Sequence, residues 1–342
     1  MSLPIEQKLA CYIASRLPEA SDVCVTDFAR IAGGASRETF RFGLTYRMNS
    51  EKVSRKLILR RDMPSSLLES ERRIEFAAYK AFFGTGIPVP EMLWLEEDLV
   101  HLDQPFFIAV ELSGFEADPN LLQTEAFAPY REEVGRQMWS YLGLIARQDP
   151  VALGYGEFVT IPDPADVWRQ QLDAWEGVLD DDSVRADPIL RAMIRWMRRN
   201  PPPPPTKLAV VHGDYRTGNY LYDAQGNIHG ILDWEMTHIG DPLEDLGWSL
   251  NKIWCYGKDE RRGGLLARDK AIRIWEEASG LNADPAAIHW WELLATVKAQ
   301  ALWTSAAHNW INSEKPELIH AFTAWCAINS EDSIALELME RS

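Results

Sequence analysis

The sequence of 342 residues has only 4 cysteines and no long uninterrupted hydrophobic segment. The cysteines are scattered singly, without the paired spacing or nearby histidines of a zinc site or redox dithiol, so we expect buried or incidental thiols at Cys11, Cys24, Cys255 and Cys326. The absence of any window of about 18 apolar residues argues against a membrane-spanning helix. The first residues lack a basic region followed by an apolar stretch, so we expect a cytoplasmic protein.

Basic residues are also in deficit. The chain carries 35 Lys and Arg against 51 Asp and Glu, a net charge of −16. Non-specific binding to nucleic acid or to an anionic membrane needs a cationic surface, so we expect neither partner. The deficit is uneven, because residues 1–112 hold 14 basic and 16 acidic residues whereas residues 113–342 hold 21 and 35.

The first third of the chain predicts an antiparallel sheet with helices packed on it. Segments rich in β-branched and aromatic residues, separated by turn-forming stretches, predict strands over 23–31, 39–46, 53–60, 91–95 and 106–112. Apolar residues at helical spacing predict helices over 5–17 and 70–83. The expected fold class is therefore α+β.

Beyond residue 112 the residue pattern predicts long helices, and the sequence is rich in tryptophan. Of the 14 tryptophans, 13 lie from Trp139 onward, so we expect two regions with different cores, divided into residues 1–112 and 113–342. Five prolines, Pro201–Pro205, predict a stiff, exposed connector.

Residues 208–248 carry the strongest chemical signal. An apolar strand at Leu208–Val211 leads into a polar loop that contains His212 and Asp214, and Asn219 follows five residues after Asp214. A predicted hairpin then ends on Asp233, fourteen residues after Asn219. The hairpin brings the oxygen-bearing side chains of Asp214, Asn219 and Asp233 to one end of a small sheet.

This set of side chains suits phosphoryl transfer. That reaction needs a carboxylate to position the attacking hydroxyl and accept its proton, a role that Asp214 fits. It also needs hard oxygen ligands that hold magnesium on the phosphates, and Asn219 and Asp233 fit this second role.

The segment H-G-D-Y-R-T-G-N, with I-L-D-W-E and G-D-P-x-x-D-L, resembles the aminoglycoside phosphotransferase family. Its L-D-W-E-x-x-x-x-G-D-P form most resembles the kinase-like domain associated with acyl-CoA dehydrogenases. The resemblance implies a protein-kinase-like bilobal fold, with a small nucleotide-binding N-lobe and a larger, mainly helical C-lobe for catalysis, metal and acceptor. It implies a small-molecule kinase that uses ATP or GTP and Mg²⁺ to phosphorylate a substrate hydroxyl.

The roles of the other residues of the segment are either structural or functional. In the family the histidine at the position of His212 braces the loop, and Arg216 either contacts phosphate, neutralises Asp214 or lies on the surface. Glu235, Asp241 and Asp245 could touch metal or substrate, but Asp241 before Pro242 also reads as a helix cap, and we favour a structural role for Asp241 and Asp245.

The resemblance implies a nucleotide site in residues 1–112. Gly33, Gly34 and Ser36 would form a turn whose amides approach phosphate. Arg60 stands where protein kinases have lysine, and Glu75 is its expected ion-pair partner. The alternatives are Lys56 or Arg61 for the cation and Glu69 or Glu71 for the acid. Main-chain groups near Val110–Leu112 would bind the purine edge, which leaves ATP or GTP open.

Several points stay open at this level. Arg60 in place of lysine leaves room for a nucleotide-binding pseudokinase with a regulatory role, whereas the short segment between Asp233 and Gly240 argues against a protein kinase. The acceptor, an aminoglycoside, macrolide, hydroxyacyl thioester or other alcohol, is undetermined, as is the oligomeric state. An apolar acceptor pocket could be lined by Trp290, Trp291, Trp303, Trp310 and Trp325, but helical spacing favours core packing for Trp291, Trp303 and Trp310. The acidic C-terminal region either attracts a cationic acceptor or maintains solubility.

Overall fold

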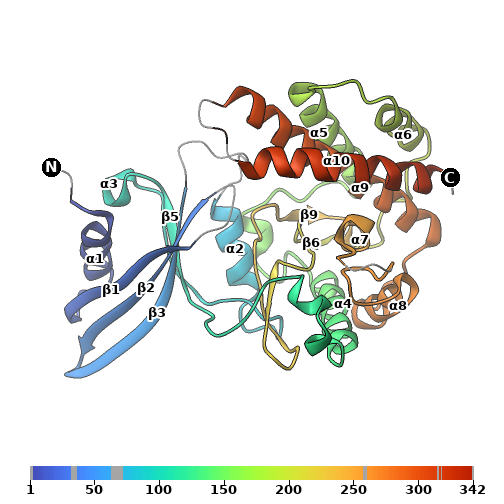
Figure 1. Ribbon diagram of the computed structural model, residues 1–342. Helices are drawn as coiled ribbons and strands as arrows, with labels where there is room; N and C mark the ends of the chain where they lie inside the picture. Colours follow the sequence, from blue (N-terminus) through green and yellow to red (C-terminus); the bar gives the residue numbers. More distant parts are fainter. Residues whose placement is uncertain are drawn as a thin grey trace. The chain divides into compact units, whose positions relative to one another are not determined.

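The computed structural model describes residues 3–31, 37–62, 72–256, 260–313, 316 and 318–340. The chain forms two compact units (Figure 1). The first unit comprises Met1–Phe115 with His229–Ile231, and the second comprises Glu116–Ile228 with Leu232–Ser342.

The first unit is built on a five-stranded antiparallel sheet in the order β1-β2-β3-β5-β4, which confirms the predicted antiparallel sheet. The strands are β1 (Ser21–Ile31), β2 (Arg37–Met48), β3 (Glu51–Asp62), β4 (Met92–Glu96) and β5 (Phe106–Val110). Its helices are α1 (Ile5–Arg16), α2 (Arg72–Phe82) and the short α3 (Leu99–Leu102).

Alternation along β5 gives the sheet two packed faces. Phe106 and Ile108 join the buried cluster that α1 covers with Leu9 and Ile13, whereas Phe107 packs against Phe76 and Tyr79 of α2. Successive strand residues point to opposite sides, so α1 and α2 lie on opposite faces of the sheet (Figure 1). Helix α2 is thereby fixed beside β3, where Arg60 lies.

The second unit is mainly helical, as expected from its sequence. Its long helices are α4 (Arg131–Arg147), α5 (Val167–Asp182), α6 (Pro188–Arg199), α7 (Pro242–Ser249), α8 (Arg268–Ser279), α9 (Pro285–Asn312) and α10 (Leu318–Met339). Short 3-10 helices lie at 121–123, 125–127, 155–157 and 252–254. Helix α9 contacts α5, α6, α7 and α10, and is buried along much of its length. The fully buried tryptophans of this unit include Trp139, Trp234, Trp248, Trp275, Trp290 and Trp291.

Two small strand pairs carry the segment of chemical interest. Strand β6 (Ala209–Val211) pairs antiparallel with β9 (His238–Gly240), a partner that the sequence did not predict, and β7 (Tyr220–Tyr222) pairs with β8 (Ile228–Ile231). The proline segment connects α6 to β6, but the prediction of an exposed connector is wrong at Pro202, which is buried.

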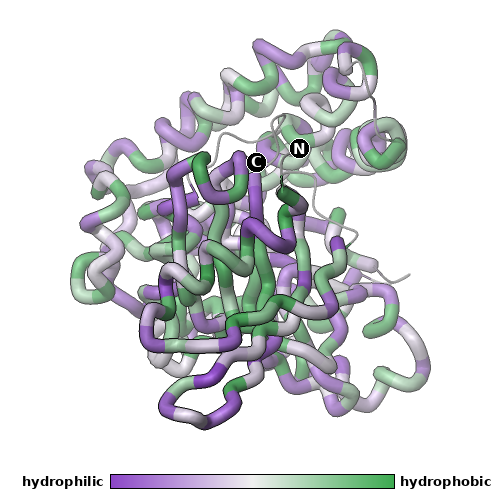
Figure 2. Tube along the Cα trace, turned by 90° about the vertical axis from the view of Figure 1, so that its left-hand side faces the viewer, coloured by the Kyte–Doolittle hydropathy of each residue, from purple (hydrophilic) through white to green (hydrophobic). Residues whose placement is uncertain are grey.

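Hydrophobic and hydrophilic residues are mixed along the chain (Figure 2). Among the described residues, no helix is both long and apolar enough to cross a membrane. Cys11, Cys24 and Cys326 are exposed and Cys255 is half-buried, and all four are free thiols. Of the two predicted alternatives, incidental thiols is the one that fits the three exposed cysteines.

Candidate active site

The site begins where β6 ends, at His212, Gly213 and Asp214. The backbone turns sharply at Gly213, whose φ is +85°. A Cβ at this position would lie 2.4 Å from the carbonyl oxygen of Met236, so the loop requires glycine both for its conformation and for its close packing. The turn places Asp214 beside the N-terminal part of β7.

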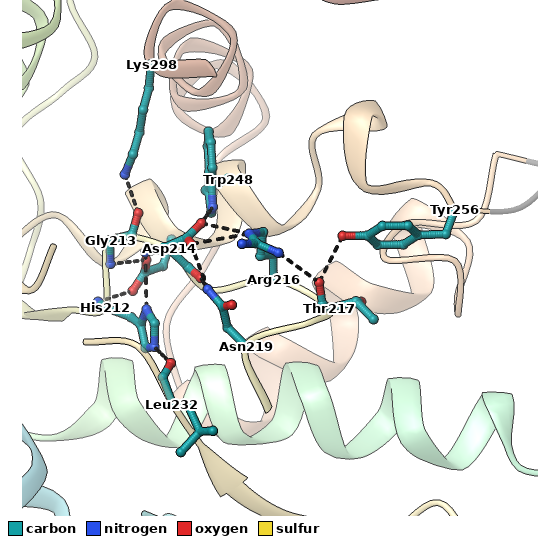
Figure 3. Close-up of polar contacts among 11 residues, drawn as sticks. His212, Gly213, Asp214, Arg216, Thr217, Asn219, Leu232, Trp248, Tyr256 and Lys298 are labelled. Carbon is teal, nitrogen blue, oxygen red and sulfur yellow. Dashed lines mark hydrogen bonds and ion pairs between the residues drawn. The ribbon is translucent and has the colours of Figure 1, made fainter. Parts of the chain in front are cut away.

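His212 is fully buried and braces the loop (Figure 3). Its Nε2 lies 2.9 Å from the carbonyl oxygen of Leu232, so Nε2 carries the proton, and its Nδ1 accepts from the amide of Asp214 at 3.1 Å. Burial lowers the pKa of His212 to about 4, which keeps the ring neutral at pH 7. Both ring nitrogens are therefore used in holding the loop.

The carboxylate of Asp245, in α7, holds the other side of the same turn. It accepts from the amide of His212 at 2.6 Å and from the amide of Gly213 at 2.9 Å. Burial raises the pKa of Asp245 to about 6. Asp241 caps α7 by accepting from the amide of Leu243 at 2.8 Å, and burial raises its pKa to about 7. The carboxylates of Asp245 and Asp241 thus hold the loop and the N-terminus of α7, respectively.

Asp214 is held by donors from three side chains (Figure 3). Its Oδ1 accepts from Nε1 of Trp248 at 2.8 Å and from Nε of Arg216 at 3.1 Å. Its Oδ2 accepts from Nδ2 of Asn219 at 2.7 Å. The carboxylate is thus fixed in one orientation at the end of the loop.

Arg216 is the cation next to Asp214. Its guanidinium carbon lies 4.6 Å from the centre of the Trp254 ring. Burial disfavours its charge and is the largest single effect, but the negative charge of Asp214, the neighbouring Tyr256 and Asp233 and the hydrogen bond to Asp214 together outweigh it, so the pKa of Arg216 is raised. Of the alternatives left open by the sequence, these contacts match neutralisation of Asp214 and not a surface position.

Asn219 and Asp233 are brought together by the β7–β8 hairpin. The backbone amide of Leu232 donates to the backbone carbonyl of Asn219 at 2.8 Å. Asp233 is the next residue after Leu232, so its backbone lies close to Asn219. Because Nδ2 of Asn219 donates to Asp214, its side-chain oxygen faces away from that carboxylate. Asp233 adopts φ +69°, a conformation rare for residues with a Cβ and concentrated at functional sites. Glu235 follows, half-buried, in the turn before β9.

The first unit contains the expected ion pair. Arg60 Nη1 lies 2.6 Å from Oε1 of Glu75, whose side chain is fully buried, and Arg60 also lies 6.0 Å from the Phe107 ring centre. Arg61 pairs instead with Glu38 at 2.8 Å, and Lys56 is exposed. Of the three cations considered, Arg60 is the one that the structure pairs with Glu75.

The other residues predicted to bind nucleotide are the glycine turn and the end of β5. Gly33, Gly34 and Ser36 lie outside the described residues. Val110 ends β5 and its amide donates to Glu91 at 2.9 Å, so that amide is engaged within the sheet. Leu112 lies just beyond the strand and is half-buried.

Sequence reasoning missed two side chains of the second unit. Trp248 donates directly to Asp214, and Lys298, in α9, donates to the carbonyl of Gly213. Trp248 lies three residues after the recognised Asp245, so the periodicity of α7 could have suggested it. Lys298 is far from the motif in sequence and no local pattern marks it.

The tryptophans considered for an acceptor pocket have divergent positions. Trp290 and Trp291 are 1% exposed and belong to the core. Trp303 is half-buried, and the centre of its ring lies 6.4 Å from that of Trp254. Core packing is wrong for Trp310, which is 37% exposed, and Trp325 is 78% exposed. These two tryptophans line an open apolar groove between α9 and α10.

The model of a phosphotransferase enzyme family matches residues 27–281. The chain belongs to this family. The assignment confirms the resemblance drawn from residues 208–248. Human acyl-CoA dehydrogenase family member 11, a relative, is 26% identical over 241 residues, which are 66% of this chain and 30% of that protein. The phosphotransferase-family chain therefore spans less than a third of the length of this relative.

Solved structures confirm the expected fold class. A putative aminoglycoside phosphotransferase from Ralstonia eutropha has a TM-score of 0.77 at 16% identity, with 98% of each chain covered. The GDP and kanamycin complex of APH(2″)-IIIa has a TM-score of 0.59 at 12% identity, covering 99% of this chain and 100% of that one. The phosphotransferase-family member described here thus has the α+β, protein-kinase-like fold of these structures.

Proposed function

We propose that this protein is a small-molecule kinase, which transfers the γ-phosphoryl group of ATP or GTP to a substrate hydroxyl in the presence of Mg²⁺. The observation that carries the proposal is the orientation of Asp214, whose two carboxylate oxygens accept from Trp248, Arg216 and Asn219. Phosphoryl transfer depends on such positioning more than on covalent chemistry.

In this proposal Asp214 orients the acceptor hydroxyl and takes its proton. A general base must be within hydrogen-bond reach of that proton, so its direction matters as much as its basicity. Arg216 supplies positive charge beside Asp214 at 3.1 Å. We assign to it the stabilisation of negative charge around the reacting group, together with the positioning of Asp214.

The donor set of Asn219 and Asp233 fits magnesium. Both residues offer oxygen, and the amide nitrogen of Asn219 is already engaged by Asp214, which leaves its side-chain oxygen for a ligand role. Among the described residues, no group of three or more His, Cys, Asp or Glu side chains could hold a metal ion. Two protein groups together with phosphates and water are a usual magnesium arrangement, and the ion would neutralise charge on the phosphates.

Nucleotide binding is assigned to residues 1–112, and catalysis, metal and acceptor binding to residues 113–342. Arg60, held by Glu75 at 2.6 Å, retains the cation that the nucleotide site of a kinase requires. We assign a phosphate-binding turn to Gly33, Gly34 and Ser36, and the purine edge to backbone near Val110–Leu112. The GDP and kanamycin complex of a structural neighbour supports a nucleotide co-substrate and a small-molecule acceptor.

The test is a screen of acceptors with both nucleotides. The purified protein is incubated with ATP or GTP and a panel of aminoglycosides, macrolides, hydroxyacyl thioesters and simple alcohols, and phosphorylated product is detected by ³¹P NMR. We expect product with at least one acceptor in Mg²⁺ and none after chelation with EDTA. Nucleotide binding without turnover on any acceptor would support a pseudokinase and reject the proposal.

A further inference from the structure

A buried lysine outside the motif contacts the loop that carries Asp214. Lys298 belongs to α9 and is 3% exposed. Its Nζ donates to the carbonyl oxygen of Gly213, the residue before Asp214 (Figure 3). The sequence separation between Lys298 and Gly213 is 85 residues, so this contact exists only in the folded unit.

The surroundings of Lys298 fix the position of its ammonium group. Nζ lies 4.8 Å from the centre of the Trp248 ring, 5.3 Å from that of Trp175 and 4.0 Å from the carboxylate of Glu244. An ammonium group withdrawn from water is stable only with acceptors, aromatic faces or opposite charge around it. The ammonium group of Lys298 has neighbours of all three kinds. Two of these neighbours, the Gly213 carbonyl and the Trp248 ring, belong to residues that also hold Asp214 in place.

The first of these groups is the loop backbone. Gly213 is covalently joined to Asp214, and its amide is already held by Asp245 at 2.9 Å. Lys298 holds the carbonyl of the same residue. The second group is the indole of Trp248, whose ring lies under the ammonium while its Nε1 donates to Asp214 at 2.8 Å.

We propose that Lys298 is a positioning residue for the carboxylate of Asp214. The proposal rests on the proposed function of Asp214 as the residue that orients the acceptor. One ammonium fixes both the peptide that precedes Asp214 and the indole that donates to it. Without Lys298, the Gly213 carbonyl loses its donor and the Trp248 ring loses its cation, so the direction of the carboxylate is less well defined.

The principal test replaces Lys298 by methionine, which keeps an unbranched side chain up to the Cε position and removes the ammonium group. We expect kcat to fall about 10–100-fold while the nucleotide KM stays within about twofold, because the hydrogen bond that this substitution removes holds the catalytic loop. Lys298→Arg keeps a cation with a differently shaped donor set, and we expect its kcat to lie between those of wild type and Lys298→Met.

A matched control removes another buried charge from the same helix. Glu292 is 5% exposed and pairs with Arg268 of α8 at 2.8 Å. Glu292→Gln therefore destabilises α9 through a different neighbour, and its kcat is expected to stay within about twofold of wild type. An equal loss of kcat in Glu292→Gln and Lys298→Met at equal melting temperatures would overturn the proposal.

A second readout does not depend on activity. The indole N–H resonance of Trp248, assigned by its disappearance in Trp248→Phe, reports the hydrogen bond to Asp214. We expect this resonance to move in Lys298→Met and to stay in place in Glu292→Gln. If the wild-type protein turns over no acceptor, the proposed function fails. The Trp248 indole N–H resonance still shows whether Lys298 positions the indole that donates to Asp214. An unmoved resonance, or a kcat within about twofold of wild type in Lys298→Met, rejects the role of Lys298.

Should Lys298→Met fail to fold, both measurements are made on Lys298→Arg. We then expect a loss of kcat of at least about threefold at an unchanged nucleotide KM, together with a moved Trp248 resonance. Wild-type kcat and an unmoved resonance in this variant would reject the proposal.

Discussion

Gly213→Ala tests whether the shape of the catalytic loop is as tightly determined as the structure indicates. Gly213 has φ +85°, and an added Cβ would lie 2.4 Å from the carbonyl oxygen and 2.7 Å from the Cβ of Met236. Separations under 3 Å force a shift, and here both nearest atoms belong to or adjoin backbone. The substitution therefore combines an unfavourable conformation with a steric overlap.

The two costs can be estimated separately. A residue with a Cβ in the left-handed region costs about 1–2 kcal/mol, and overpacking in a well-packed interior costs a further ~1–3 kcal/mol. We therefore expect Gly213→Ala to lower the free energy of unfolding by about 2–5 kcal/mol. The overlap also displaces the residue before Asp214, so we expect kcat to fall about 10–100-fold.

Gly280→Ala is the matched control. Gly280 ends α8 with φ +73°, but nothing lies within 4 Å of a Cβ added there. This variant experiences the conformational cost alone, so we expect a destabilisation of about 1–2 kcal/mol and wild-type turnover. The assays are urea unfolding followed by tryptophan fluorescence, and nucleotide turnover with the acceptor found by screening. Equal destabilisation in both variants, or full activity in Gly213→Ala, would refute the reasoning.

Two further predictions concern buried charges. Arg60→Met removes the cation that lies 2.6 Å from the buried carboxylate of Glu75, so thermal and urea unfolding are expected to show a loss of about 3–5 kcal/mol, and the nucleotide KM is expected to rise. The double variant Arg60→Met/Glu75→Leu should recover stability but not nucleotide binding, and recovery of both would contradict the role of Arg60. Burial raises the pKa of Glu331 from 4.5 to about 8. Between these two pKa values the folded protein retains a proton that the unfolded chain releases. The free energy of unfolding therefore falls as the pH rises from the lower to the higher pKa, by on the order of 3–5 kcal/mol. Glu331→Gln should reduce that slope in unfolding midpoints measured from pH 5 to 8, whereas an unchanged slope would show that Glu331 is not the group responsible.

The sequence was most informative where local pattern and motif coincide. The β-branched and aromatic segments over 39–46 and 53–60 predict consecutive antiparallel strands, and the structure pairs β2 with β3 from Arg37 opposite Asp62 to Met48 opposite Glu51. The inward face of α2 likewise predicts a buried Glu75, which is 1% exposed. In both cases the local composition and spacing of the side chains indicate the feature without reference to distant segments.

Contacts between distant segments could not be predicted in the same way. Strand β9 has only three residues and forms because β6 lies beside it, with Val210 opposite Ile239. Lys298 reaches Gly213 only because α9 packs beside α7. Helical spacing also misplaced Trp310, because α9 is buried on all sides from Trp290 to Ala301 but becomes exposed toward its C-terminal end.

The central claim is that Asp214 is the residue that accepts the proton of the acceptor hydroxyl, and Asp214→Asn tests it most directly. The amide keeps the size of the side chain and one acceptor oxygen for Trp248 or Asn219. With ATP or GTP, Mg²⁺ and the acceptor found by screening, we predict that kcat falls by about 10²–10⁴-fold while the nucleotide Kd and the unfolding midpoint change little. Turnover at the wild-type rate in Asp214→Asn would contradict the account.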